Sequence, residues 1–305
     1  MLWIIFPLTT AILFSLCNFT ENAVVDNYCK KLRPQCLKVA YLGFDIIILL
    51  AFLIWQGSAL LSGLEISGIL TLMAAGAVGT LGGIPYLLAL KKDNTTGVTL
   101  LTQMAPIMSL AFGMMFLRQM PSLNQGFAFA LIMIGMLLAV VQTGRKFIKI
   151  ELKTGSLMAM ACLSWVLSDV IFVSGAGDIN FWTGFFWLSV GAFVTNAFMA
   201  LIFKSWREDL KKFWKRNKKK KFAGLTAIYG TWFVAEIMWR MGMLAVPIAI
   251  MSVTANVMQL IATFILGIIL TMLWPKFGRE KLEKKTIFRH ALATIIVIAG
   301  IILIG

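Results

Sequence analysis

Apolar runs long enough to cross a lipid bilayer recur along almost the whole of this 305-residue chain. About 20 apolar residues in a helix span the ~30 Å hydrocarbon core, and a helix satisfies the backbone groups that lipid cannot hydrogen-bond. The chain is 60% hydrophobic and 13% charged, against roughly 45–50% and about 25% in soluble domains. The sequence therefore predicts an all-α polytopic membrane protein with no soluble domain.

Ten such runs are separated by polar or charged connections. The first run has no basic region and no small-residue cleavage site, so we expect it to be a span and not a removable signal peptide. The connections are short except for Lys204–Lys221 and Pro275–His290, which are highly charged and carry no pattern of a folded module. We predict ten transmembrane helices with these approximate bounds: Leu2–Val25, Lys38–Trp55, Ile66–Leu90, Gly97–Leu117, Gly126–Gln142, Gly155–Val173, Phe181–Phe203, Leu225–Ala245, Ile248–Leu273 and Ala291–Ile304.

The basic residues sort by side of the membrane. All of them except Arg118 and Arg240 fall in the connections after the first, third, fifth, seventh and ninth spans, with Lys38 counted in the first of these. Positively charged connections stay cytoplasmic, so we predict a cell-membrane protein with cytoplasmic basic loops and both termini on the other side. The run Arg207–Lys221 suits anionic lipid or nucleic acid; we expect it to anchor on anionic headgroups and expect no nucleic-acid partner.

The fourth and ninth spans each carry polar side chains along one helical face. The faces are Thr96, Thr99, Gln103 and Pro106 in the fourth span, and Ser252, Asn256, Gln259 and Thr263 in the ninth. One constant offset places Gln103 on Gln259 and Thr96 on Ser252. The matching faces predict that both spans line one cavity, whereas the alternative is that these side chains only hold helices together.

A basic linker near Gly144–Thr154 divides the chain into two sets of five spans. Because five is odd, the second set enters the membrane from the opposite side. We therefore predict two inverted five-helix repeats, residues 1–145 and 146–305, of which residues 204–221 form a basic cytoplasmic loop. A substrate site is expected near the middle of the membrane, where the repeats meet.

Several stretches carry a family resemblance: Tyr86-Leu-Leu-Ala-Leu-Lys-Lys-Asp-Asn-Thr-Thr96, Gln103-Met-Ala-Pro106-Ile, Phe116-Leu-Arg-Gln119-Met-Pro-Ser-Leu-Asn-Gln125-Gly126, Ala245-Val-Pro247 and Ile298-Ala-Gly300-Ile. The chain resembles the EamA-like family of the drug/metabolite transporter superfamily along essentially its whole length. The resemblance implies ten spans as a fused five-plus-five repeat and a central cavity to which spans five and ten are peripheral. It also implies transport of amino acids, other metabolites or drugs.

The chain departs from the family pattern in two respects. Many relatives carry a Gly-Glu pair where this chain has Arg118-Gln119, so no role of that glutamate is carried over. Most relatives place their basic residues in the opposite set of loops and have cytoplasmic termini. The distribution here predicts the inverted orientation.

The eighth span carries aromatic and ionisable side chains along one helical face. Tyr229, Trp232, Glu236 and Trp239 follow helical spacing, and Arg240 lies one turn after Glu236. Ionisable residues inside a span are costly and mark functional sites. One interpretation is an aromatic-walled site in which Glu236 holds a cation or a coupling proton and Arg240 holds a carboxylate or phosphate. The other is an internal Glu–Arg pair with rings packed against neighbours.

Asp169 in the sixth span and Asn18 with Glu21 in the first are further candidates. Asp45 in the second span is expected to pair with Lys38. The predicted substrate-binding residues are Glu236, Arg240, Trp232, Trp239, Tyr229, Gln103, Asn256, Gln259, Asp169 and Asn18.

We expect a secondary transporter of small metabolites or drug-like solutes working by alternating access. Acidic residues and aromatic rings in the spans favour a cationic or zwitterionic substrate, with a proton or cation as a possible coupling partner. No Walker sequence is present, and the spacing of Cys29 and Cys36 fits no zinc motif, so neither an enzyme nor a cofactor or metal is expected. Two alternatives stay open: a solute-binding sensor or scaffold, and an enzyme acting on lipid-linked substrates.

Overall fold

The computed structural model describes residues 2–60, 65–92, 98–99, 101–140, 152–177, 179–215 and 218–273, with scattered positions between 292 and 303. Every regular element in this part of the chain is a helix. The predicted linker near Gly144–Thr154, the connection Pro275–His290 and the tenth span lie wholly or mostly outside the described residues.

Each half of the chain contributes a series of helices. The first half forms η1 (Leu2–Ile4), α1 (Ile5–Tyr28), α2 (Cys36–Gln56), η2 (Gly57–Leu60), α3 (Ile66–Leu90), α5 (Met104–Leu117) and α6 (Leu123–Val140). The second half forms α7 (Leu152–Ala176), α8 (Phe181–Ile202), α9 (Lys204–Phe213), α10 (Lys218–Ala245) and α11 (Ile248–Leu273).

Six stretches are long and apolar enough to cross a membrane: Ile5–Tyr28, Cys36–Leu60, Ile66–Leu90, Lys153–Ala176, Phe181–Ile202 and Ile248–Leu270. Met104–Leu117 and Leu123–Ile134 are shorter apolar helices. The predicted all-helical membrane fold is therefore confirmed in this coarser form. The count of ten spans and the inverted repeat remain predictions.

The fourth predicted span is not one continuous helix. The chain turns at Thr102–Gln103 before α5 begins at Met104. Thr102 Oγ1 donates to Thr99 O at 2.7 Å, and the Ala105 amide donates to Thr102 O at 2.9 Å. Pro106 lies in the first turn of α5, where its missing N–H is tolerated but cannot continue an earlier helix. The segment predicted as the fourth span, Gly97–Leu117, is therefore interrupted at Thr102–Gln103, and whether it crosses the membrane as one span remains a prediction.

The connection Lys204–Lys221 is also more ordered than predicted. Its first part forms α9, which buries Trp206, Asp209 and Phe213. The spacing of Trp206 and Phe213 gives the short helix one apolar face. Most of the other residues of α9 are charged, so the sequence alone indicates a loop. The expectation of a charged loop without a folded pattern is corrected to a basic amphipathic helix.

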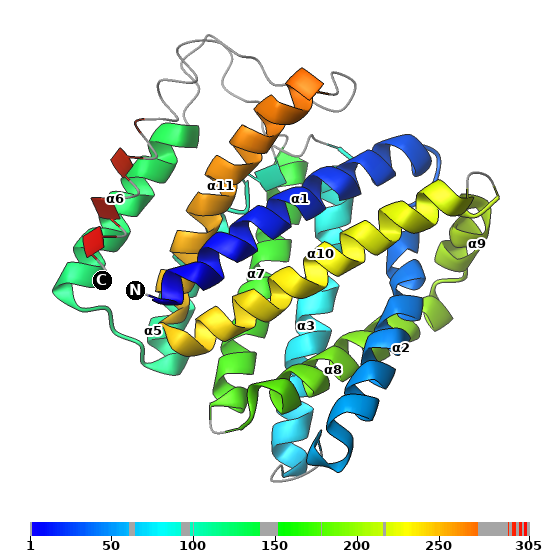
Figure 1. Cartoon of the computed structure of the whole chain (residues 1–305), viewed down its shortest axis with the longest axis horizontal. Coiled ribbons are helices and arrows are strands. Elements are labelled where there is room, and N and C mark those ends of the chain that lie inside the picture. Colours follow the sequence, from blue (N-terminus) through cyan, green and yellow to red (C-terminus); the bar gives the residue numbers. More distant parts are fainter. Residues whose placement is uncertain are drawn as a thin grey trace.

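Two antiparallel helix pairs build the bundle. In Figure 1, α1 and α10 lie side by side in front of α3 and α7. Glycines mark the α1–α10 contact, because a Cβ at Gly224 would lie 3.1 Å from Val24 and one at Gly242 would lie 3.0 Å from Phe6. The Cys17 thiol lies between these points, 3.6 Å from Ile228 O.

Helices α3 and α8 come close enough for backbone contact. A Cβ at Gly76 would lie 1.9 Å from Leu188 O, and a Cβ at Gly191 would lie 2.0 Å from Met73 O. Small residues permit such approach between membrane helices. Gly76 and Gly191 therefore allow close packing of these two helices.

The basic ends of several helices meet at one end of the bundle. Arg33 before α2 forms an ion pair with Asp209 of α9 at 3.3 Å. Lys91 after α3 donates to Leu32 O at 2.7 Å, and Lys221 of α10 donates to Phe213 O. The basic connections after the first, third and seventh predicted spans therefore lie together at one end of the bundle.

Candidate functional site

A cavity of about 210 Å³ lies between α1, α2, α3, α5, α7, α8, α10 and α11. Nine of the ten predicted site residues line it, and Gln103 is the exception. The nine are Asn18, Asp169, Tyr229, Trp232, Glu236, Trp239, Arg240, Asn256 and Gln259. Helices from both halves of the chain thus contribute to one cavity.

Arg240 and two carboxylates form a buried cluster near the end of α10. Arg240 Nε donates to Glu236 Oε1 at 2.8 Å, and its Nη2 donates to Ser168 Oγ at 3.0 Å. Arg240 Nη1 lies 2.7 Å from Asp169 Oδ1 as an ion pair without hydrogen-bond alignment. Trp239 Nε1 also donates to Asp169, at 3.1 Å. The internal Glu–Arg pair considered from the sequence is present, and Arg240 forms ion pairs with both carboxylates.

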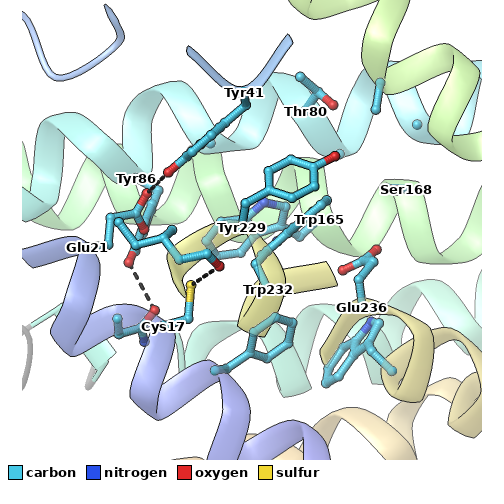
Figure 2. Close-up of a pocket in the computed structure, with 18 of the residues that line it drawn as sticks. Cys17, Glu21, Tyr41, Thr80, Tyr86, Trp165, Ser168, Tyr229, Trp232 and Glu236 are labelled. Atoms are coloured by element: carbon cyan, nitrogen blue, oxygen red, sulfur yellow. Dashed lines mark hydrogen bonds between the residues drawn. The ribbon is translucent and has the colours of Figure 1, made fainter. Parts of the chain in front are cut away.

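A second polar cluster lies toward the basic end of the bundle. The Tyr41 hydroxyl donates to Glu21 Oε1 at 3.1 Å, and the Tyr86 hydroxyl donates to Asn18 Oδ1 at 3.0 Å. Lys38 also lines the cavity here. Figure 2 shows Glu21 and Tyr41 at one side of the cavity and Ser168 and Glu236 at the other.

Asp45 ties three helices together beside the cavity. It accepts hydrogen bonds from the Tyr229 hydroxyl of α10 and, at 3.1 Å, from Asn196 Nδ2 of α8. The predicted Asp45–Lys38 pair is not formed, because no Lys38–carboxylate distance within 4.0 Å occurs among the described residues. Lys38 and Asp45 lie almost two turns apart on α2, and other helices supply nearer donors.

Aromatic rings separate the two polar clusters. Tyr229 lies 5.7 Å from Tyr41 and 5.8 Å from Trp232, measured between ring centroids. Tyr86 and Trp165 form another pair at 5.6 Å. In Figure 2 the rings of Trp165, Tyr229 and Trp232 stand between Glu21 and Glu236. The cavity therefore has polar ends and an aromatic middle.

The two polar faces of the fourth and ninth spans serve different purposes. Asn256 and Gln259 line the cavity, as predicted. Gln103 instead donates through Nε2 to Asn256 O at 3.2 Å and to Thr99 O at 3.3 Å. The expectation that Gln103 lines the cavity was wrong, because its amide links the turn before α5 to α11.

Several lining residues were absent from the predicted site. Lys38, Tyr41, Tyr86 and Trp165 all line the cavity. A signal for two of them is present in the sequence, because Lys38, Tyr41 and Asp45 follow the i, i+3, i+7 spacing of one helical face. Lys38 was assigned to a loop because it lies close to the other basic residues there.

Comparison with known proteins gives this cavity a context. Residues 2–141 match the EamA-like transporter family. The resemblance predicted from the sequence is confirmed over this region. Members of the EamA-like family are membrane transporters of the drug/metabolite superfamily and not enzymes. Together with the apolar helices, the match identifies a multi-pass membrane protein.

A fold similar to that of the whole chain is also found in a solved structure. One crystal structure of a protein is similar with a TM-score of 0.63 and 14% sequence identity, covering 97% of this chain and 96% of that chain. At this identity the likeness concerns the fold alone. The search of curated proteins found no match.

Proposed function

We propose that this protein is a secondary transporter that moves small cationic or zwitterionic metabolites across the cell membrane by alternating access. The observation that carries the proposal is the charge of the cavity. Four acidic side chains line it, Glu21, Asp45, Asp169 and Glu236, against two basic ones. Aromatic rings between them provide faces that attract organic cations.

The size of the cavity supports a metabolite over a larger drug-like solute. Its volume is about 210 Å³, below the roughly 300–1,000 Å³ of pockets for drug-sized ligands. A solute of this size would contact both the aromatic middle and one polar end at once.

Unequal contacts between equivalent helix pairs support alternating access. In an inverted repeat, the pair α3–α8 corresponds to the pair α10–α2. The first pair is in backbone contact, with Gly76 against Leu188 O. The second meets through side chains, with Tyr229 bonded to Asp45 and its ring 5.0 Å from Phe44. If α10 and α2 came into backbone contact while α3 and α8 moved apart, the cavity would open to the other side of the membrane.

Glu236 is the residue that we propose couples transport to a proton or cation. Only its Oε1 is held by Arg240, and the side chain faces the cavity. Its Oε2 makes no hydrogen bond to the described residues. A carboxylate held on one oxygen can accept a proton or an ammonium group on the other.

The orientation and division of the chain belong to the same proposal. The basic end of the bundle, with Arg33, Lys91 and α9, would face the cytoplasm. The exposed lysines of α9 and of the start of α10 would contact anionic headgroups. Residues 1–145 and 146–305 would be the two repeats that move against each other.

Uptake into vesicles tests the proposal. Purified protein would be reconstituted and offered labelled leucine, phenylalanine and tryptophan, and the amines that correspond to each without its carboxylate. We expect saturable uptake of at least one solute that falls at least about tenfold in Glu236→Gln. The matched control is Glu208→Gln on the exposed side of α9, which should transport normally. Normal pH-dependent uptake by Glu236→Gln would overturn the role of Glu236, and a panel without uptake would overturn the proposal.

A further inference from the structure

The two basic side chains of the cavity differ in how they are satisfied. Arg240 is 4% exposed and contacts Asp169, Glu236 and Ser168 within 3.0 Å. Lys38 also lines the cavity, but among the described residues no carboxylate oxygen lies within 4.0 Å of its ammonium group. Lys38 is therefore the cation of this cavity that is available to a ligand.

The surroundings of Lys38 direct its ammonium group inward. A Cβ at Gly83 of α3 would lie 2.2 Å from Lys38 Nζ and 2.6 Å from Cε, so the glycine provides the space that the side chain occupies. Nζ lies 5.9 Å from the centroid of the Tyr41 ring. A positive charge removed from water needs an anionic or hydrogen-bonding partner, and the cavity is the side from which one can come.

Glu21 supplies a complementary group at the same end. Its Oε1 accepts the Tyr41 hydroxyl at 3.1 Å, and the Tyr86 hydroxyl is a second hydrogen-bonding neighbour of this carboxylate. The two oxygens of a carboxylate offer about four acceptor sites, so Glu21 can accept a further hydrogen bond. Glu21 and Lys38 both line the cavity, and among the described residues they do not form an ion pair within 4.0 Å. An ammonium and a carboxylate on one carbon atom could therefore meet Glu21 and Lys38 together.

We propose that Lys38 binds the carboxylate of a zwitterionic substrate and thereby selects an amino-acid-like solute over the corresponding amine. The inference rests on the proposed function and narrows its substrate class. The ammonium group of the solute binds Glu21, and its side chain lies between the rings of Trp165 and Tyr229. Arg240 does not take the carboxylate, because Asp169 and Glu236 already occupy it.

A role for Lys38 in folding alone makes a different prediction. Such a lysine would neutralise Glu21 and Asp45 without regard to the solute, and its replacement would weaken zwitterion and amine binding alike. A carboxylate-binding lysine affects only solutes that carry a carboxylate. Ligand pairs that differ in this one group separate the two roles.

The experiment compares phenylalanine with 2-phenylethylamine, and leucine with isoamylamine. Binding to the purified full-length protein would be followed by tryptophan fluorescence and by the melting temperature. We expect the wild type to bind a zwitterion at least about tenfold more tightly than its amine, as a lost charged hydrogen bond implies. Lys38→Met should remove this preference, Lys38→Arg should keep part of it, and Lys211→Met, an exposed lysine on α9, should leave it unchanged.

Gly83→Ala gives a second route that keeps the lysine. The added methyl group would displace Lys38 Nζ, so zwitterion binding should weaken while amine binding persists. Equal binding of both solutes by the wild type, or an unchanged preference in Lys38→Met, would overturn the assignment of Lys38. The vesicle assay separates this failure from that of the proposed function, because a transporter that takes up amines and zwitterions alike would still be a transporter.

Discussion

The hydroxyl of Tyr229 donates a hydrogen bond to the carboxylate of Asp45, and the two residues are 184 positions apart in the chain. This bond joins α2 of the first half to α10 of the second half beside the cavity. Asn196 of α8 completes the site by donating to the other Asp45 oxygen. A buried carboxylate is costly unless it is hydrogen-bonded, so these two donors hold Asp45 in place.

Tyr229→Phe should destabilise the protein. The change removes a donor and leaves a buried Asp45 oxygen without its partner, which costs about 1–3 kcal/mol. Thermal unfolding in detergent would measure the loss. The matched control is Tyr28→Phe, because the Tyr28 ring packs on Phe213 and its hydroxyl has no hydrogen bond to the described residues. Equal melting temperatures for the two variants would contradict the importance of this bond.

Arg240→Met should be more damaging. It leaves the carboxylates of Asp169 and Glu236 close together without their cation, and breaking a buried pair typically costs about 3–5 kcal/mol. Adding Asp169→Asn to Arg240→Met should recover part of the stability, because one of the two stranded charges is removed. Chemical unfolding of the single and double variants forms the test. A strictly additive double variant would show that Asp169 and Arg240 are not coupled.

Gly191→Ala should disrupt the contact between α3 and α8. The new Cβ would lie 2.0 Å from Met73 O, so the helices must move apart, and overpacking of this kind costs about 1–3 kcal/mol or more. Gly230→Ala on α10 is the control, because nothing lies within 4 Å of its Cβ and alanine favours the helix. The melting temperature should fall in Gly191→Ala and hold or rise in Gly230→Ala; the same response in both would rule out a special role for the close approach.

The orientation can be tested by labelling from one side. The four cysteines Cys17, Cys29, Cys36 and Cys162 are free and buried, so an introduced exposed cysteine should react first with an impermeant maleimide. We expect Lys211→Cys on α9 to react only from the cytoplasmic side. Met120→Cys, at an exposed position between α5 and α6, should react only from the other side. The opposite pattern would reverse the proposed topology, and the unsubstituted protein gives the background.

Much of the helical arrangement can be predicted from the sequence because lipid leaves few alternatives. An apolar run of sufficient length must be helical there, and the bounds predicted for the third span, Ile66–Leu90, agree with α3. The break before α5 could not be placed in the same way. It depends on how Thr102 bonds to Thr99 and on the proline that follows, both inside a continuous apolar run.

The site was partly predictable for a related reason. Charged residues in the middle of a span, such as Glu236 and Asp169, are costly in lipid, so they are expected to line a cavity or to form an ion pair. Lys38 lies close to the basic connection before α2, so the sequence alone assigns it to the residues that orient the chain in the membrane. Only the fold shows that Gly83 of α3 makes room for its ammonium group. Likewise, only the contact with Asn256 O shows that Gln103 faces α11.

The most direct test of the central claim is solute counterflow. Vesicles that contain the purified protein would be loaded with an unlabelled solute of the panel, and entry of the same labelled solute would be followed over time. A carrier with alternating access should accumulate the label transiently above its external concentration, and Glu236→Gln should lose this overshoot. Saturable binding of the same solute without any overshoot in the wild-type protein would contradict the account and favour a sensor that does not transport.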